Sequence, residues 1–160
     1  MNYYLVHDTP IGELILEANL EHLIKISFNR GHLNRVKACS VKKNLILEKT
    51  VEQLDEYFFN NRKIFTINYT LNTTWFFKKV LEEVSLIKFG KVKSYKQIAK
   101  TLKNKNAYRA VANANARNPL PIIIPCHRVI RSSGEIGGYS GGFINKEYLL
   151  SLENTTGSFF

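Results

Sequence analysis

Apolar and polar residues alternate in the first part of the chain, with turn signals between the runs. The alternating runs cover residues 3–7, 13–18 and 23–28. A period of two is typical of half-buried strands, so we expect an antiparallel meander. Residues 45–59 instead repeat with helical spacing. Residues 64–69 could return to the sheet as a further strand. The pattern predicts a small α/β unit with no evident chemistry.

The second half of the chain has mainly helical spacing. Thr74 can cap a helix that continues to Ile87. Further helices are predicted over residues 94–102, 107–117 and 146–152. Residues 103–106 form a polar turn between two of them, which matches a helix-turn-helix. We therefore predict an α+β protein, with a scaffold domain over residues 1–70 and a mainly helical domain over residues 71–160.

Composition and cysteine usage limit the class of protein. Hydrophobic residues make up 44% of the 160 residues, enough for a core, yet no run approaches the length of a membrane span. We expect a soluble, cytoplasmic protein without a membrane partner. Cys39 and Cys126 do not make a disulfide framework, and the four histidines lack zinc-site spacing. No metal or cofactor is expected.

Positive charge is concentrated in one part of the sequence. The formal net charge is +10, and residues 88–131 contain Lys and Arg but no Asp or Glu. Such a segment favours a nucleic-acid partner, although a general contribution to solubility is the simpler alternative. The helix predicted over 107–117 is rich in alanine, so its backbone could approach DNA closely, with Arg109 as its longest side chain. Tight packing in a helical bundle would explain the same alanines.

Candidate chemistry lies at Pro125–Cys126–His127, directly after three isoleucines. A thiol reacts as its thiolate, and a neighbouring base raises the thiolate fraction. Adjacent side chains of a strand point to opposite faces, so cooperation requires a turn, with a helix or loop beginning at about Cys126. A helix N-terminus would also lower the pKa of the thiol. Alternatively, Cys126 is a small buried hydrophobe and His127 a surface residue. A glycine-rich loop over residues 137–142 could approach a ligand closely.

Residues 74–153 resemble the O6-alkylguanine-DNA alkyltransferases, also called methylated-DNA–protein-cysteine methyltransferases. The resemblance rests on ordered motifs along this segment. They are Phe89-Gly90, Ser94-Tyr95, Arg109-Ala110-Val111, Asn118-Pro119, residues 125–129, Gly138-Tyr139-Ser140-Gly141-Gly142 and residues 149–153. It implies a ribonuclease-H-like sheet and helix in the first domain. It also implies irreversible, stoichiometric transfer of an alkyl group to the protein's own cysteine. The group would come from O6 of alkylated guanine and from O4 of alkylated thymine.

The resemblance implies a catalytic role for five residues. Cys126 is the expected nucleophile, His127 its base through a bound water, and Glu153 the carboxylate that orients the imidazole. Tyr95 would donate a proton to guanine N3, and Asn118 would brace the turn before the active site.

It also implies a surface for double-stranded DNA, bound by a monomer that flips the base out from the minor groove. Arg109 would fill the vacated stack. The backbone carbonyls of Cys126 and Val129 would read the base edge, together with the hydroxyl or N–H groups of Tyr139 and Ser140. The remaining residues expected at this surface are Ala110, Arg117, Arg128 and Gly141.

Two other functions are compatible with parts of the sequence. One is a module that senses alkylated DNA without repairing it, although such relatives replace the cysteine that is present here. The other is a Cys-His hydrolase, which would leave the basic helix-turn-helix unexplained. Ala112 stands where many relatives have glycine. Asn115 and Ala116 lie near the expected pocket rim, so the range of alkyl groups is open.

Overall fold

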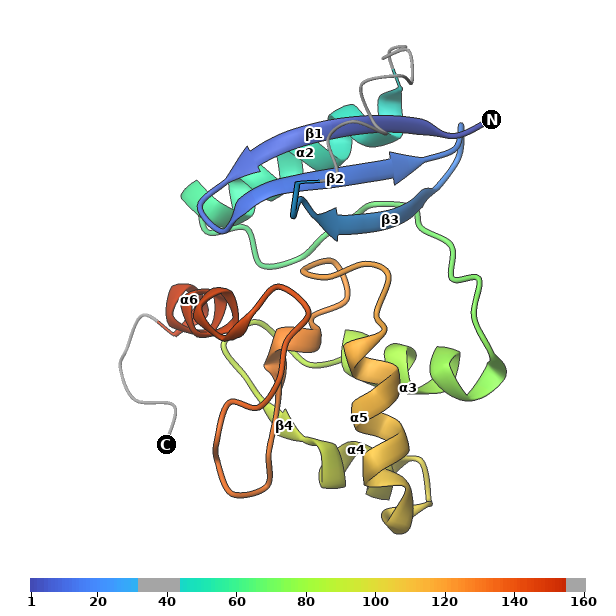
Figure 1. The fold of residues 1–160 in the computed structure, drawn as a ribbon, viewed down its shortest axis with the longest axis vertical. Coiled ribbons are helices and arrows are strands. Elements are labelled where there is room, and N and C mark those ends of the chain that lie inside the picture. The colour runs from blue at the N-terminus through green and yellow to red at the C-terminus, as the bar shows by residue number, and fades with distance from the viewer. Residues whose placement is uncertain (32–43, 155–160) are drawn as a thin grey trace. The chain divides into compact units, whose positions relative to one another are not determined.

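The computed structural model describes residues 1–31 and 44–154, and the chain divides into two compact units, Met1–Leu71 and Asn72–Phe160 (Figure 1). Cys39 lies outside the described residues. No helix in the described ranges is both long and apolar enough to cross a membrane.

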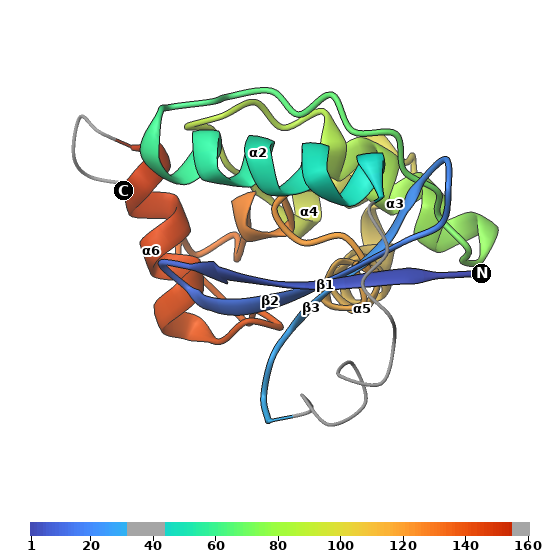
Figure 2. The ribbon, with the colours of Figure 1, turned by 90° about the horizontal axis from the view of Figure 1, so that it is seen from above.

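The described part of the first unit is a three-stranded antiparallel sheet covered on one face by a helix. Its strands β1 (Tyr3–Thr9), β2 (Gly12–Ala18) and β3 (Leu23–Phe28) are neighbours in the order of the chain. Leu14, Leu16 and Ala18 alternate with more exposed residues along β2 and are fully buried. Helix α2 (Leu45–Phe59) lies across this sheet (Figure 2). The alternating pattern therefore marked the buried face of the sheet.

Residues 64–69 follow the sheet without becoming a fourth strand. Only Tyr69 forms a bridge, parallel to Leu23. Upstream, the side-chain amide of Gln53 on α2 donates to Thr66 Oγ1 (2.7 Å) and accepts from the Thr66 N–H (2.8 Å). Because a helix side chain satisfies these groups, the expected return to the sheet is limited to one residue.

The second unit is mainly helical and carries one short parallel strand pair. Strand β4 (Lys93–Ser94) pairs with β5 (Val129–Ile130). The α-helices are α3 (Trp75–Ser85), α4 (Tyr95–Thr101), α5 (Tyr108–Ala116) and α6 (Phe143–Glu153). Two short 3₁₀ helices, η1 (Lys105–Ala107) and η2 (Cys126–Arg128), complete it. With the first unit, this confirms the α+β class.

Helix α4, η1 and α5 form the expected helix-turn-helix. The Ser94 side chain accepts from the Gln97 N–H, and Gln97 bonds back to the Ser94 N–H, a reciprocal capping box. Lys103 adopts a left-handed conformation (φ 58°) that reverses the chain before α5. Helix α5 packs against α3 and α4. Helix α6 begins earlier than the spacing predicted, directly after Gly142 (φ 91°).

Candidate active site

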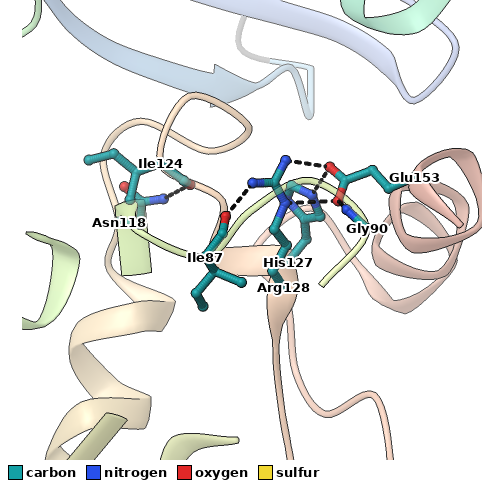
Figure 3. Close-up of polar contacts among 7 residues, drawn as sticks. All are labelled: Ile87, Gly90, Asn118, Ile124, His127, Arg128 and Glu153. Atoms are coloured by element: carbon teal, nitrogen blue, oxygen red, sulfur yellow. Dashed lines mark hydrogen bonds and ion pairs between the residues drawn. The ribbon is translucent and has the colours of Figure 1, made fainter. Parts of the chain in front are cut away.

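The Asn118 side chain stabilises the turn that precedes Cys126. Its side-chain amide donates to the Ile124 carbonyl at 2.8 Å (Figure 3). Its Oδ1 accepts from the Leu120 N–H at 3.0 Å. Between these anchors Ile122 has a positive φ of 74°, which is rare for a β-branched residue. Cys126 then begins η2 and is almost fully buried. The turn expected at this position is present.

Behind the turn, His127, Arg128 and Glu153 form a buried polar cluster. His127 Nε2 lies 2.7 Å from Glu153 Oε1. The Arg128 guanidinium donates to both oxygens of the same carboxylate, from Nε at 2.8 Å and from Nη2 at 2.9 Å, and its Nη1 donates to the Ile87 carbonyl at 2.6 Å (Figure 3). A bidentate arginine pair fixes the orientation of the carboxylate. Glu153 is thereby held against the imidazole.

The cluster fixes the protonation state of its members. Burial disfavours an ionised carboxylate, but the hydrogen bonds from His127 and Arg128 and the charge of the Arg128 guanidinium outweigh it and lower the pKa of Glu153 to about 2. Burial lowers the pKa of His127, against the opposing effect of Glu153, so the imidazole is neutral. Since Glu153 is ionised, Nε2 carries the proton and donates it to Oε1. Nδ1 is then an unprotonated acceptor, and it has no hydrogen-bond partner among the described residues.

The Cys126 thiol is not a preformed thiolate. Burial raises its pKa, and the hydrogen bond from Asn118 and the charge of Lys146 only partly oppose this. The backbone N–H groups of Cys126 and His127, at the N-terminus of η2, lower this pKa as expected, but burial has the larger effect and the net shift is upward. The thiol therefore needs a base before it can act as a nucleophile.

Sequence reasoning missed Lys146 on α6. Its side chain is fully buried, and Nζ donates to the Val129 carbonyl at 2.6 Å and to the Gly138 carbonyl at 3.3 Å. Burial lowers the pKa of this amine to about 8. Lys146 thus ties the residue after η2 to the glycine-rich loop and places an ammonium group near Cys126. A lysine in a helix normally faces solvent, so no sequence signal marked it.

A cavity of about 380 Å³ lies beside this turn. Its lining residues come from α4, α5, the residue after β5 and the glycine-rich loop. They are Tyr95, Ala112, Asn115, Ala116, Arg131, Gly138, Tyr139 and Ser140. The Asn115 side chain donates to the Cys126 carbonyl at 3.2 Å, which joins the cavity to the cysteine. Burial raises the pKa of both Tyr95 and Tyr139, so both phenols are protonated at neutral pH and can donate hydrogen bonds.

The residues expected at a DNA surface differ in their exposure to solvent. Arg109, Ala110 and Arg117 lie exposed on or directly after α5. Arg128 is buried, and Glu153 and Ile87 bind its guanidinium. The expectation that Arg128 contacts DNA is therefore corrected, because its guanidinium is buried and paired with the Glu153 carboxylate.

Val129 and Gly141, which were also expected to contact the base, are not among the residues that line the cavity. Val129 is buried, and its carbonyl, expected to read a base edge, already accepts from Lys146. The Gly141 carbonyl accepts from the Asn145 side chain at 2.9 Å. Within residues 1–31 and 44–154, no group of three or more His, Cys, Asp or Glu side chains could hold a metal ion.

Both units match models of one protein family. Residues 2–71 match the ribonuclease-like domain of 6-O-methylguanine DNA methyltransferase, and residues 75–155 match its DNA-binding domain. The chain belongs to the 6-O-methylguanine DNA methyltransferase family. This confirms both the resemblance and the ribonuclease-like first domain. The family match covers nearly the whole chain.

Individual relatives align over nearly their full length. The methylated-DNA–protein-cysteine methyltransferase of Methanosarcina acetivorans is 36% identical over 154 residues, which cover 96% of this chain and 99% of the relative. The constitutive enzyme of Bacillus subtilis is 35% identical, with 96% of each chain covered.

Solved structures agree with this assignment. The crystal structure of Mycobacterium tuberculosis O6-methylguanine methyltransferase superposes with a TM-score of 0.86 at 33% identity, covering 99% of this chain and 96% of that one. Mycobacterium tuberculosis OGT in complex with DNA gives a TM-score of 0.84 at 34% identity, covering 96% and 93%.

Proposed function

We propose that this protein is a methylated-DNA–protein-cysteine methyltransferase that repairs DNA by moving the alkyl group of O6-alkylguanine to Cys126. The observation that carries this proposal is the buried thiol next to a neutral imidazole, which Glu153 holds with Nδ1 unprotonated. The family assignment of both units supports the same reaction. Double-stranded DNA is the substrate.

The transfer is a displacement at the alkyl carbon. Nδ1 of His127 takes the thiol proton through a bridging water, and the carbon–sulfur bond to Cys126 forms as the carbon–O6 bond breaks. Guanine would leave as an anion, so the protonated Tyr95 phenol donates to N3 of the base. Glu153 stabilises the imidazolium that forms. Asn118 and Lys146 favour the thiolate, Asn118 by a hydrogen bond and Lys146 by its charge.

The product is a thioether, so each molecule acts once. No thiol exchange reverses a carbon–sulfur bond, because that exchange breaks only disulfides. We propose the same chemistry for O4-alkylthymine, whose alkyl carbon is bonded to an equivalent oxygen. The protein acts as a monomer in the cytoplasm and joins the nucleoid when bound to DNA.

A base inside a duplex cannot reach a buried thiol, so the base is flipped out. Arg109 lies exposed on α5, where it can fill the vacated stack from the minor groove. Ala110 lets the helix approach the duplex, and Arg117 contacts phosphate. The cavity beside Asn115 then receives the base, with Gly141, Tyr139, Ser140 and the Cys126 and Val129 carbonyls around its edge.

Intact-mass analysis after incubation with duplex DNA containing O6-methylguanine tests this function. We expect one added methyl group per molecule, mapped by peptide analysis to Cys126 and absent in Cys126→Ser. Multiple turnover, or binding of the lesion with an unmodified cysteine, would contradict the proposal. The second of these outcomes would instead support a non-repairing sensor.

Arg109→Ala separates base flipping from chemistry. We expect slower repair of duplex DNA, while alkylation of Cys126 by free O6-benzylguanine is retained. Lys49→Ala is the matched control, because this residue is an exposed cation on α2, outside the surface assigned to DNA. If Arg109→Ala slowed the reactions with duplex DNA and with free O6-benzylguanine equally, Arg109 would have no role in base flipping.

A further inference from the structure

Asn115 is a buried side chain with one half of its amide unused. It is 4% exposed on α5, and its Nδ2 donates to the Cys126 carbonyl at 3.2 Å. Its Oδ1 is also buried and has no hydrogen-bond donor within the described part of the chain. A carbonyl oxygen can only accept, so turning the amide over would bring two acceptors together at Cys126. The orientation is therefore set, and Oδ1 is the free acceptor.

A buried acceptor without a partner destabilises the folded state, so such groups are rare without a function. Asn115 lines the 380 Å³ cavity together with Tyr95 and Tyr139. Its side-chain amide also interacts with the Tyr95 hydroxyl, the group that donates to guanine N3 in the proposed reaction. The free acceptor thus lies between the reactive turn and the proton donor, where the base is bound.

The chemistry of the base decides what this acceptor can bind. Alkylation at O6 removes the N1 proton, so N1, N3 and N7 of O6-alkylguanine are all acceptors. The exocyclic amino group at C2 is the remaining donor, and it carries two protons. O4-alkylthymine has no donor on its ring once O4 is alkylated. An acceptor in this cavity therefore distinguishes the two lesions.

We propose that Asn115 is a specificity-determining residue whose Oδ1 accepts a hydrogen bond from the exocyclic amino group of the flipped guanine. This inference rests on the proposed function and deepens it. One N–H of the amino group reaches Asn115, and the other is left for the Cys126 carbonyl that Asn115 itself holds, because the Val129 carbonyl already accepts from Lys146. The contact favours O6-alkylguanine over O4-alkylthymine, because a base without the donor leaves Oδ1 unsatisfied.

Single-turnover repair of three duplexes tests the contact. They carry O6-methylguanine, O6-methylhypoxanthine, which differs only by lacking the amino group, and O4-methylthymine. In the wild type we expect the hypoxanthine lesion to react roughly 10- to 100-fold more slowly than the guanine lesion, the effect of one unsatisfied buried acceptor. In Asn115→Leu this ratio falls towards one, because the guanine rate drops while the two lesions without the amino group no longer leave a buried acceptor unsatisfied and react faster.

Asn113→Leu is the control, since Asn113 is exposed on the same helix and should keep the wild-type ratio. Asn115→Ala repeats the test with a side chain that cannot overfill the cavity. An equal loss on all three duplexes would overturn the inference and leave Asn115 with a structural role alone. Equal wild-type rates on the two purines would also overturn it, independently of any variant. Failure of the proposed function is distinct, because the wild type would then modify Cys126 with none of the three.

Discussion

Arg128 and Glu153 form a buried bidentate ion pair, with hydrogen bonds of 2.8 and 2.9 Å between the guanidinium and the two carboxylate oxygens. The same carboxylate accepts from His127 at 2.7 Å. Glu153 therefore holds the imidazole while Arg128 keeps Glu153 ionised. The arginine never touches the cysteine, yet the tautomer of its neighbour His127 depends on it.

Removing Arg128 leaves the Glu153 carboxylate buried without its cation. We expect Arg128→Met to lower the free energy of unfolding by about 3–5 kcal/mol, since breaking one side of a buried pair leaves an uncompensated charge. Urea denaturation measures this. Arg117→Met is the exposed control and should change stability by about 0.5 kcal/mol or less. A small effect at Arg128 would show that the pair contributes little.

Acid should destabilise the second unit through the same cluster. The pKa of Glu153 is about 2 in the folded protein against an ordinary value of 4.5, so the unfolded chain binds its proton first as the pH falls. The pKa of His127 is also lowered from 6.5, with the same sign. Stability is full above about pH 6.5 and declines below it, first through His127 and then, below about pH 4.5, through Glu153.

Urea denaturation at a series of pH values follows this decline. His127→Gln should remove the part that begins near pH 6.5 and keep the part at lower pH. A wild-type stability that stays flat between pH 7 and pH 4 would contradict the direction of both shifts.

The sequence predicted elements better than it predicted buried polar partners. Alternation located β1 to β3, because each strand has one solvated face, and the cap predicted at Thr74 marked the start of α3. The run at 64–69 has the same apolar character, but Gln53 of α2 takes the backbone N–H that a strand partner would have used. A side chain distant in sequence therefore keeps residues 64–69 from forming a strand, and local periodicity carries no information about such a contact.

The predictions for charged residues of the site failed for a related reason. Arg128 belongs to a run of cations, and a cation in such a run is normally exposed; Glu153, its partner, is 25 positions away. Lys146 was missed because only tertiary packing places its amine on the Val129 carbonyl. The resemblance to a known family named Cys126, His127 and Glu153, and the fold joins His127 to Glu153 in the buried cluster directly after the buried Cys126. Their roles in catalysis stay predictions.

Asn118 should affect stability and reactivity together. Asn118→Ala leaves the Ile124 carbonyl and the Leu120 N–H without their side-chain partner, so we expect a loss of about 2–3 kcal/mol in urea denaturation. The hydrogen bond that opposes the rise in the Cys126 pKa also disappears. Alkylation of Cys126 by a free O6-alkylguanine base should therefore slow even under conditions where the variant is fully folded. Asn113→Ala, on the exposed side of α5, should alter neither quantity.

Lys146 should influence the thiol through its charge. Lys146→Met keeps the length of the side chain but removes the ammonium group near Cys126 and the donor to the Val129 and Gly138 carbonyls. Because that charge lowers the pKa of Cys126, its loss raises this pKa. A shift of one pKa unit corresponds to roughly a tenfold smaller thiolate fraction at neutral pH, so we expect single-turnover repair to slow by about that factor.

Titration of the Cys126 thiolate by ultraviolet absorbance, in a Cys39→Ser background, measures this shift directly. The exposed Lys100→Met variant should titrate as the wild type does. If Lys146→Met slows repair but leaves the titration unchanged, Lys146 acts by holding the glycine-rich loop against Val129 and not through its charge. Since the pKa of the amine itself is about 8, the difference between wild type and Lys146→Met should also shrink above that pH, where the wild-type amine loses its proton.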